Sequence, residues 1–146
     1  MTFPRALRYT ATVLGHARNI MTEKVVSVAA TASLTDIAEI LVDAQIGGVP
    51  VVERDGRVVG FVSEIDLMDA LLRDDPSHTP AKEVMTTPPI VIDEFAPTDD
   101  VMALLRERKI HHLPVVRAGR LVGIITPLDV LRYFVGLVTS DPLDAG

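Results

Sequence analysis

Two seven-residue segments of the chain share one polar pattern. Residues 60–66 read GFVSEID and residues 123–129 read GIITPLD, so each has a glycine, two apolar residues, a hydroxyl residue and an aspartate three positions later. At a helix N-terminus, such a hydroxyl accepts a backbone N–H bond and the carboxylate lies beside the positive end of the helix dipole. The same amides, hydroxyl and carboxylate could instead contact a phosphate and the two hydroxyls of a ribose. The residues are Ser63, Asp66, Thr126 and Asp129, and the pattern alone leaves both interpretations open, with helix capping favoured.

A second candidate is the segment KIHHLPV at residues 109–115, which holds the adjacent His111 and His112. Neighbouring residues that enter a strand point to opposite faces, so we expect one histidine to be partly buried and the other to be solvated. The same geometry argues against a pair of metal ligands, and neither His16 nor His78 adds a ligand at metal-binding spacing. No metal site is predicted.

Nothing in the sequence marks a catalytic centre. It has no G-x-S-x-G, no P-loop and no G-x-G-x-x-G, and the absence of cysteine excludes a thiolate nucleophile. Asp93, Glu94, Asp99 and Asp100 cluster around a turn, which is more typical of a solvated surface near a helix dipole than of a catalytic dyad. We therefore expect no catalytic residue and no enzymatic activity.

The sequence contains an internal repeat in two copies. Residues 20–52 align without a gap on residues 84–116, and residues 57–72 align on residues 120–135 after a turn that differs by one residue. Two copies of about 60 residues indicate a duplication within a compact domain rather than a solenoid. One such copy would be marginally stable alone, so we expect the two copies to pack together with pseudo-twofold symmetry.

Each copy is expected to fold as β-α-β-β-α, which places the chain in the α/β (α+β) class. Short β-branched runs predict the strands, and the pairs Asp55-Gly56 and Ala118-Gly119 tolerate the positive φ of a hairpin turn. The predicted strands cover residues 25–28, 49–52 and 57–62 in the first copy, and residues 90–92, 113–116 and 121–125 in the second.

The helices have recognisable starts and apolar stripes. Ser33, which lies three residues before Asp36, and Pro97 are start signals for the first helix of each copy. The last helix of each copy begins at Ser63 or Thr126. Its apolar residues recur every three or four positions, as in an amphipathic helix. These residues are Ile65, Met68 and Leu72 in the first copy, and Leu128, Leu131 and Val135 in the second.

The two copies resemble a pair of CBS (cystathionine β-synthase) domains, an arrangement called a Bateman module. The resemblance covers about residues 17–137 and rests on IMT, GGVPVV and GRVVGFVSEIDL in the first copy and on VMT, HHLPVV and GRLVGIITPLDV in the second. It implies a leading segment (1–16), CBS repeat 1 (17–73), a linker (74–80), CBS repeat 2 (81–137) and a tail (138–146).

The family resemblance implies a regulatory sensor that binds an adenine nucleotide or adenosyl ligand in clefts between the repeats. The ligands it suggests are AMP, ADP, ATP, S-adenosylmethionine and NADH, with no cofactor required. Asp66 and Asp129 would bind the ribose, and Ser63 and Thr126 the phosphate or sugar. His111 and His112 match a phosphate-facing position of the family, where the first copy has only glycines. The residues implied around the adenine are Val26, Val28, Pro89, Ile90, Val49 and Leu113.

Composition limits the partners. Residues 1–18 contain three arginines and no acid, whereas the remainder has eleven basic residues against twenty acidic ones. An acidic body repels nucleic acid, and no apolar run is long enough to span a membrane, so we expect neither partner. We interpret the basic segment as a leading helix rather than a targeting peptide, and a cytoplasmic location is expected.

Paired CBS repeats commonly form flat dimers through their helices, so a homodimer is expected. The alternative function is an interaction scaffold that dimerises and whose ligand clefts are vestigial. The helix residues expected to leave too much apolar surface on a monomer are Ile37, Leu41, Leu67, Val101, Leu105 and Val130.

Overall fold

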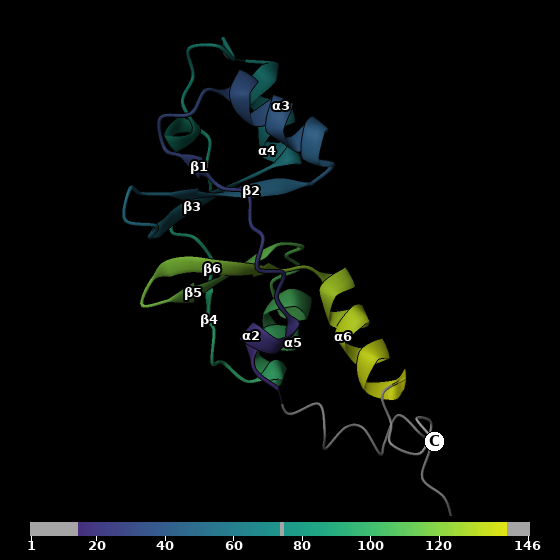
Figure 1. Ribbon diagram of the computed structural model, residues 1–146. Coiled ribbons are helices and arrows are strands. Elements are labelled where there is room, and N and C mark those ends of the chain that lie inside the picture. Colours follow the sequence, from purple (N-terminus) through teal and green to yellow (C-terminus); the bar gives the residue numbers. More distant parts are fainter. Residues whose placement is uncertain (1–14, 74, 140–146) are drawn as a thin grey trace, which may run out of the picture. The chain divides into compact units, whose positions relative to one another are not determined.

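The computed structural model describes residues 15–73 and 75–139, which form two compact units (Figure 1). The first-repeat unit holds residues 24–73, 75–90 and 118–121, and the second-repeat unit holds residues 15–23, 91–117 and 122–139. No helix within these ranges is long and apolar enough to cross a bilayer. Most of the predicted leading segment and tail lies outside the described residues.

The first-repeat unit is a three-stranded sheet with its helices on one face (Figure 1). Strand β1 pairs in parallel with β2, and β2 pairs antiparallel with β3, so the sheet order is β1-β2-β3. Ile37 and Leu34 of the first helix pack on Val49 and Val51 of the central strand, and all four are fully buried. The elements are β1 (Val28–Ala29), α3 (Leu34–Ala44), β2 (Gly48–Val52), β3 (Val58–Ser63), α4 (Glu64–Leu71) and the 3-10 helix η1 (Ala81–Glu83).

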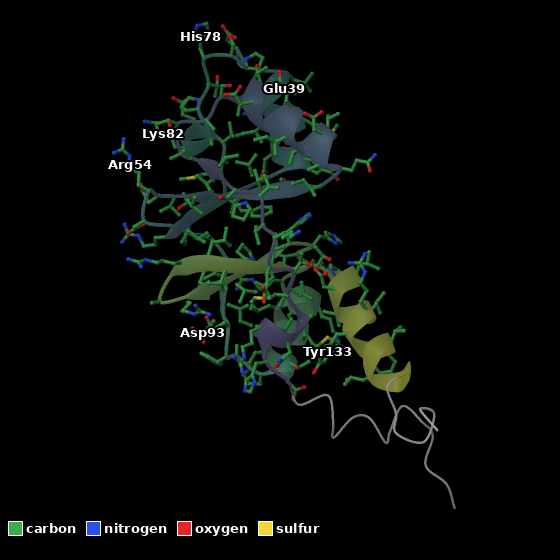
Figure 2. All side chains as sticks on the ribbon, viewed as in Figure 1. Glu39, Arg54, His78, Lys82, Asp93 and Tyr133 are labelled. Carbon is green, nitrogen blue, oxygen red and sulfur yellow. The ribbon has the colours of Figure 1, made fainter. Side chains whose placement is uncertain are left out.

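The second-repeat unit has the same sheet order, β4-β5-β6, and β4 is again parallel to its neighbour. Val101, Leu113, Val115 and Ile125 form the buried centre of this unit. Tyr133 of its last helix (Figure 2) lies against Gly15, just before the short helix that opens the described chain. The elements are α2 (Ala17–Ile20), β4 (Ile92–Asp93), α5 (Thr98–Glu107), β5 (Leu113–Arg117), β6 (Arg120–Ile125) and α6 (Pro127–Thr139).

The order β-α-β-β-α is confirmed in both repeats, and the mixed α/β class with it. The first strand of each repeat is shorter than predicted and lies further along the chain, at Val28–Ala29 and Ile92–Asp93. Val26, inside the predicted strand, is exposed. The apolar run therefore begins before the chain reaches its partner strand, and only its end is buried in the sheet.

The two hairpin turns explain the one-residue length difference between the repeats. In the second hairpin, Ala118 and Gly119 both have positive φ, as a two-residue turn of type I′ requires. In the first hairpin only Gly56 has positive φ, and its N–H donates to the carbonyl of Glu53 at 2.9 Å. The first turn is thus one residue longer, and a register shift between Val51 and Val52 accommodates it.

In each unit, the edge of the sheet pairs with a segment from the start of the other repeat, residues 21–23 or 85–86. Thr22 pairs with Ile124 beside β6 in the second-repeat unit, and Thr86 pairs with Phe61 beside β3 in the first-repeat unit. In both cases the two backbones exchange a pair of N–H···O bonds. A strand edge is thereby covered in each unit by chain that, by sequence alone, begins the opposite repeat.

Of the six residues expected to leave apolar surface on a monomer, four are buried and two, Leu105 and Val130, are half-buried. Ile37, Leu41, Leu67 and Val101 are buried in the core, because these positions face the sheets. The exposed apolar side chains of the last helices instead include those of the predicted stripe, with Met68 61% and Leu131 59% exposed. The full set is Ile65, Met68, Leu71 and Leu72 at α4, and Leu128, Leu131, Phe134 and Val135 on α6.

Candidate functional site

The hydroxyl-acid pattern of the first repeat forms a capping box at the start of α4. The Ser63 hydroxyl accepts the backbone N–H of Asp66 at 3.1 Å, and Oδ2 of Asp66 accepts the backbone N–H of Ser63 at 3.1 Å. The capping interpretation is therefore confirmed here. Oδ1 of Asp66 makes no hydrogen bond to any described residue. One oxygen of a half-buried carboxylate is thus available to another group.

The equivalent box of the second repeat is satisfied more fully. Oδ2 of Asp129 accepts bonds from the Thr126 backbone N–H at 2.8 Å and from the Thr126 hydroxyl at 2.9 Å. Oδ1 accepts a bond from the Thr22 hydroxyl at 2.8 Å and lies 3.7 Å from Nη1 of Arg132. Asp129 is only 6% exposed. A ligand that binds this carboxylate must displace a partner it already has.

A hollow of about 270 Å³ adjoins the available carboxylate of the first repeat. Its lining residues come from α4 and from the segment after the linker, both within the first-repeat unit. They are Asp66, Asp69, Arg73, Glu83 and Val84. The structure therefore brings Asp66 together with charged residues that the sequence analysis did not single out. The spacing of three and four between Asp66, Asp69 and Arg73 is the signal that could have revealed Asp69 and Arg73, whereas Glu83 has no such signal.

The glycine of each pattern has a packing role. A Cβ at Gly60 would overlap the side chain of Met85, and a Cβ at Gly123 would overlap that of Met21. Both glycines are buried in strands, and neither needs a positive φ. The absence of a side chain at each glycine thus leaves room for Met85 or Met21, and this packing holds the segment that contains the methionine next to the capping box.

The residues expected around an adenine lie in different surroundings. Val49 and Leu113 are fully buried and Val28 nearly so, so their side chains belong to the cores. Val26 is 42% exposed. Pro89 and Ile90 are half-buried. Only the last three have side-chain surface that a ligand could contact directly.

His111 is exposed and His112 is half-buried at the entry to β5, as expected for adjacent residues at the start of a strand. Across residues 15–73 and 75–139, no group of three His, Cys, Asp or Glu side chains could hold a metal ion. The two histidines thus lie just before the start of β5 and differ in exposure.

The acidic cluster differs from expectation at one residue. Asp93, Asp99 and Asp100 are exposed, but Glu94 is buried, with 2% exposed. Its carboxylate is bound by Nε and Nη2 of Arg117, and this pairing raises the pKa of Arg117. A buried carboxylate needs such a partner, which explains why Glu94 departs from the solvated surface.

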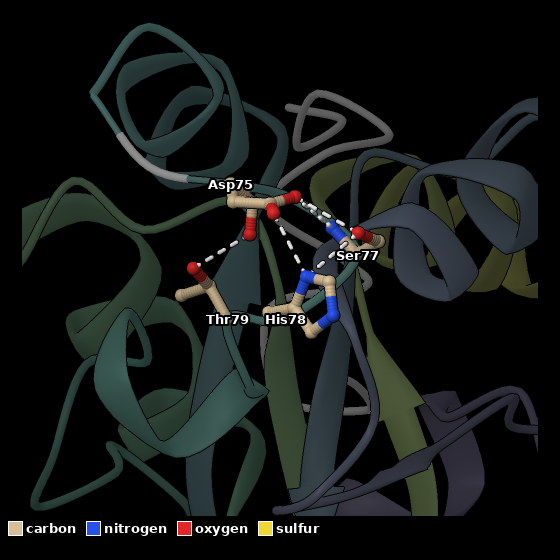
Figure 3. A network of polar contacts seen from close by, with 4 residues as sticks. All are labelled: Asp75, Ser77, His78 and Thr79. Atoms are coloured by element: carbon tan, nitrogen blue, oxygen red, sulfur yellow. Dashed lines mark hydrogen bonds and ion pairs between the residues drawn. The ribbon is translucent and has the colours of Figure 1, made fainter.

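The linker carries a local polar network centred on Asp75 (Figure 3). Its carboxylate accepts bonds from the Ser77 hydroxyl at 2.8 Å and the Ser77 backbone N–H at 3.1 Å, and lies 2.8 Å from Nδ1 of His78. Hydrogen bonds from His78 and Ser77 hold the pKa of Asp75 below its usual value. One ring nitrogen faces both Ser77 and Asp75, so the network orders a turn and is not a proton relay.

Comparison with known proteins places this geometry in a family. The model of the CBS domain matches residues 17–73 and again residues 81–136. Among curated proteins, the chain is 37% identical over 100 residues to an uncharacterized 33.4 kDa protein in the ribosomal RNA operon of Thermofilum pendens, covering 68% of this chain and 33% of that protein. This chain spans between about a third and a half of the length of the first curated relatives it matches.

Two solved structures have a similar fold. CBSX2 of Arabidopsis thaliana, in complex with AMP, has a TM-score of 0.76 and 29% identity over 84% of this chain and 98% of its own. The CBS domain pair of protein MJ0100, in complex with 5′-methylthioadenosine and S-adenosyl-L-methionine, has a TM-score of 0.74 and 28% identity over 85% of this chain and 98% of its own.

Two β-α-β-β-α repeats, each with a hydroxyl-acid box at its last helix, define a CBS-pair fold. The chain belongs to the CBS domain family. The resemblance predicted from the sequence is thereby confirmed.

Proposed function

We propose that the protein is a regulatory module that binds an adenine nucleotide or adenosyl compound and has no catalytic activity. The observation that carries this proposal is the half-free carboxylate of Asp66 beside a polar hollow, in a fold whose solved relatives include complexes with AMP and with S-adenosyl-L-methionine. A carboxylate with an available oxygen can accept hydrogen bonds from ribose hydroxyls, and these charge-assisted bonds are the stronger kind.

The individual residues take the following roles in this proposal. Asp66 and Asp129 bind ribose, and Ser63 and Thr126 lie beside the phosphate or sugar. The exposed Val26, with Pro89 and Ile90, contacts the adenine, while the buried Val28, Val49 and Leu113 support the strands behind it. His111 and His112 favour phosphate-bearing ligands at the second repeat. Asp66 offers the easier site, because Asp129 must first release Thr22 or Arg132.

A thermal-shift panel of AMP, ADP, ATP, S-adenosylmethionine and NADH tests the proposal. A ligand at a hundred times its dissociation constant stabilises the parent by about 2.7 kcal/mol, and Asp66→Asn should lose much of that increment. Asparagine is a matched replacement because it can still accept the Ser63 N–H and keep the cap. Full retention of the increment in Asp66→Asn and in a double variant with Asp129→Asn would refute the site.

We also propose that the protein is a homodimer that associates through α4 and α6. Eight apolar side chains are exposed, four at α4 and its C-terminal end and four on α6, and exposed apolar surface of this kind marks protein interfaces. Light scattering at tens of micromolar should give twice the chain mass, and Met68→Glu should shift the equilibrium toward monomer while Glu39→Gln, on α3 (Figure 2), should not. A monomeric parent would refute this assignment.

The alternative function, a scaffold that dimerises without a ligand, rests on the same exposed helices. The two functions differ in the panel above, since a scaffold gives no Asp66-dependent stabilisation by any ligand. In both, we propose a cytoplasmic protein with no nucleic-acid or membrane partner. The lack of cysteine suits a reducing compartment, and the net charge of −6 disfavours polyanions.

A further inference from the structure

The hollow beside Asp66 has an unusual charge balance. Asp66, Asp69 and Glu83 supply three carboxylates and Arg73 supplies one guanidinium, which gives the lining a formal charge of −2. Asp66, Asp69 and Arg73 recur at spacings of three and four and so lie along one face of α4 and its end. Glu83 reaches the same hollow from η1.

The guanidinium of Arg73 is partly committed. Its Nε donates to the backbone carbonyl of Asp69 at 3.1 Å, at the end of the helix. The terminal nitrogens remain for one anionic group of a ligand, such as a carboxylate. Arg73 is the one basic residue among the residues that line the hollow. The carboxylates of Asp69 and Glu83 therefore share a single positive charge.

The duplicated repeat supplies an internal comparison. At the equivalent positions, Asp69 is replaced by Arg132 and Glu83 by Asn19. Arg132 lies 3.7 Å from Asp129, so the second box is neutralised where the first is acidic. The two repeats therefore share the ribose-binding aspartate but differ in the charge beside it.

The volume suggests which part of a ligand the hollow holds. About 270 Å³ is at or below the roughly 300–1,000 Å³ typical of sites for whole drug-sized ligands. A ribose that binds Asp66 could direct its 5′ substituent into this hollow, beside the remaining charged lining. A phosphate there would be repelled by the carboxylates of Asp69 and Glu83, whereas a positively charged group would be attracted to both.

We propose that the first-repeat hollow selects adenosyl compounds with a positively charged 5′ substituent over nucleoside phosphates. This inference rests on the proposed function, because it takes Asp66 as the ribose ligand. The cation lies beside Asp69 and Glu83, and a carboxylate on the same substituent reaches Arg73. The second repeat, with Arg132 and Asn19 at the matching positions, lacks this preference.

Calorimetric titration of the full chain tests the charge directly with two pairs of probes. S-adenosylmethionine and S-adenosylhomocysteine differ by the methyl group that makes the sulfur a cation, and AMP and adenosine differ by a phosphate. One unit-charge contact at 4 Å in water corresponds to about a fivefold change in affinity. We expect S-adenosylmethionine to bind at least about fivefold more tightly than S-adenosylhomocysteine, and AMP more weakly than adenosine. Binding that disappears in Asp66→Ala belongs to this site.

Variants identify the residues responsible. Asp69→Asn and Glu83→Gln should each reduce the preference for the cation, and Asp69→Arg, which copies the second repeat, should abolish or reverse it. Glu39→Gln on α3 removes one negative charge away from the hollow lining and should leave the preference unchanged.

The possible results distinguish failure of the charge preference from failure of the proposed ligand-binding function. Asp66-dependent binding with equal affinity within both pairs of probes would overturn the charge inference and leave the proposed function standing. A preference that falls equally in Glu39→Gln would also overturn it, since net charge alone would then be the cause. Absence of Asp66-dependent binding by any of the four probes would overturn the charge inference. Retention of every ligand-dependent shift of the full panel in the double variant of Asp66 and Asp129 would overturn the proposed function as well.

Discussion

Replacing Asp129 by alanine should destabilise the protein much more than replacing Asp66, although both begin equivalent helices. Asp129 is buried and accepts three hydrogen bonds of 2.8 to 2.9 Å, two from Thr126 and one from Thr22. Asp66 accepts a single bond of 3.1 Å from Ser63 and is half-buried. The difference arises because Thr22 donates its hydroxyl to the second box, whereas among residues 15–73 and 75–139 no such bond reaches Asp66.

The magnitude follows from these bonds. Hydrogen bonds to charged groups contribute about 1.5–3 kcal/mol each, and partial replacement by water at Thr22 and Thr126 reduces the sum, so we expect a loss of about 3 kcal/mol for Asp129→Ala. Loss of a cap costs about 1 kcal/mol, the value expected for Asp66→Ala. At about 3 °C per kcal/mol for a chain of this length, the melting temperatures should fall by about 9 °C and 3 °C.

Urea unfolding without ligand, followed by far-ultraviolet circular dichroism, measures both losses. Asp99→Ala, an exposed acid in the first turn of α5, is the control for a helix-dipole effect alone and should cost at most about 0.5 kcal/mol. Thr22→Val should reproduce part of the Asp129→Ala loss. Equal losses for Asp66→Ala and Asp129→Ala would refute the claim that the two boxes differ.

Three further predictions concern packing and charge. Gly60→Ala should lower the free energy of unfolding in urea by about 1–3 kcal/mol, because the added Cβ overlaps Met85. Met85→Ala should restore much of this loss, and stabilisation by Gly60→Ala alone would contradict the prediction. Arg117→Gln should lower the urea midpoint by leaving the buried Glu94 carboxylate without its partner, and Glu94→Gln should partly rescue it. An unchanged unfolding midpoint would count against the pairing. The pKa of Asp75 is lowered in the folded state, so its carboxylate stabilises the fold above about pH 4, and this contribution disappears as pH falls through the lowered pKa. Asp75→Asn should therefore differ from the parent at neutral pH and converge with it in acid, and a difference that is constant with pH would disprove this.

The fold was predictable from the sequence because each local pattern of turns and helix starts occurs in both repeats. Ser33 and Ser63 each begin a helix as expected, since a hydroxyl that accepts the amide three residues later is a local interaction. The hairpins were predictable for the same reason, and Gly56 and Gly119 have the positive φ expected of turn residues.

Long-range contacts were not predictable from the sequence. The pairing of Thr22 with Asp129 joins residues 107 positions apart, and nothing in the spacing of either indicates it. The burial of Ile37 was also misjudged, because periodicity identifies an apolar helix face but does not say whether that face meets the sheet or a second copy of the chain.

The candidate site was predictable in its aspartates but not in its surroundings. The doubled pattern identified Asp66 and Asp129, whereas Glu83 comes from a segment beyond the linker and required the folded chain to place it. The difference in charge between the repeats follows from such neighbours and not from the shared pattern.

A crystal structure of the protein with the compound that stabilises it most in the thermal-shift panel tests the central claim most directly. The account predicts that the ribose hydroxyls lie within hydrogen-bond distance of the Asp66 carboxylate, with the 5′ substituent in the hollow lined by Asp69, Arg73 and Glu83. A ligand bound elsewhere, or a ribose turned away from both Asp66 and Asp129, would contradict it.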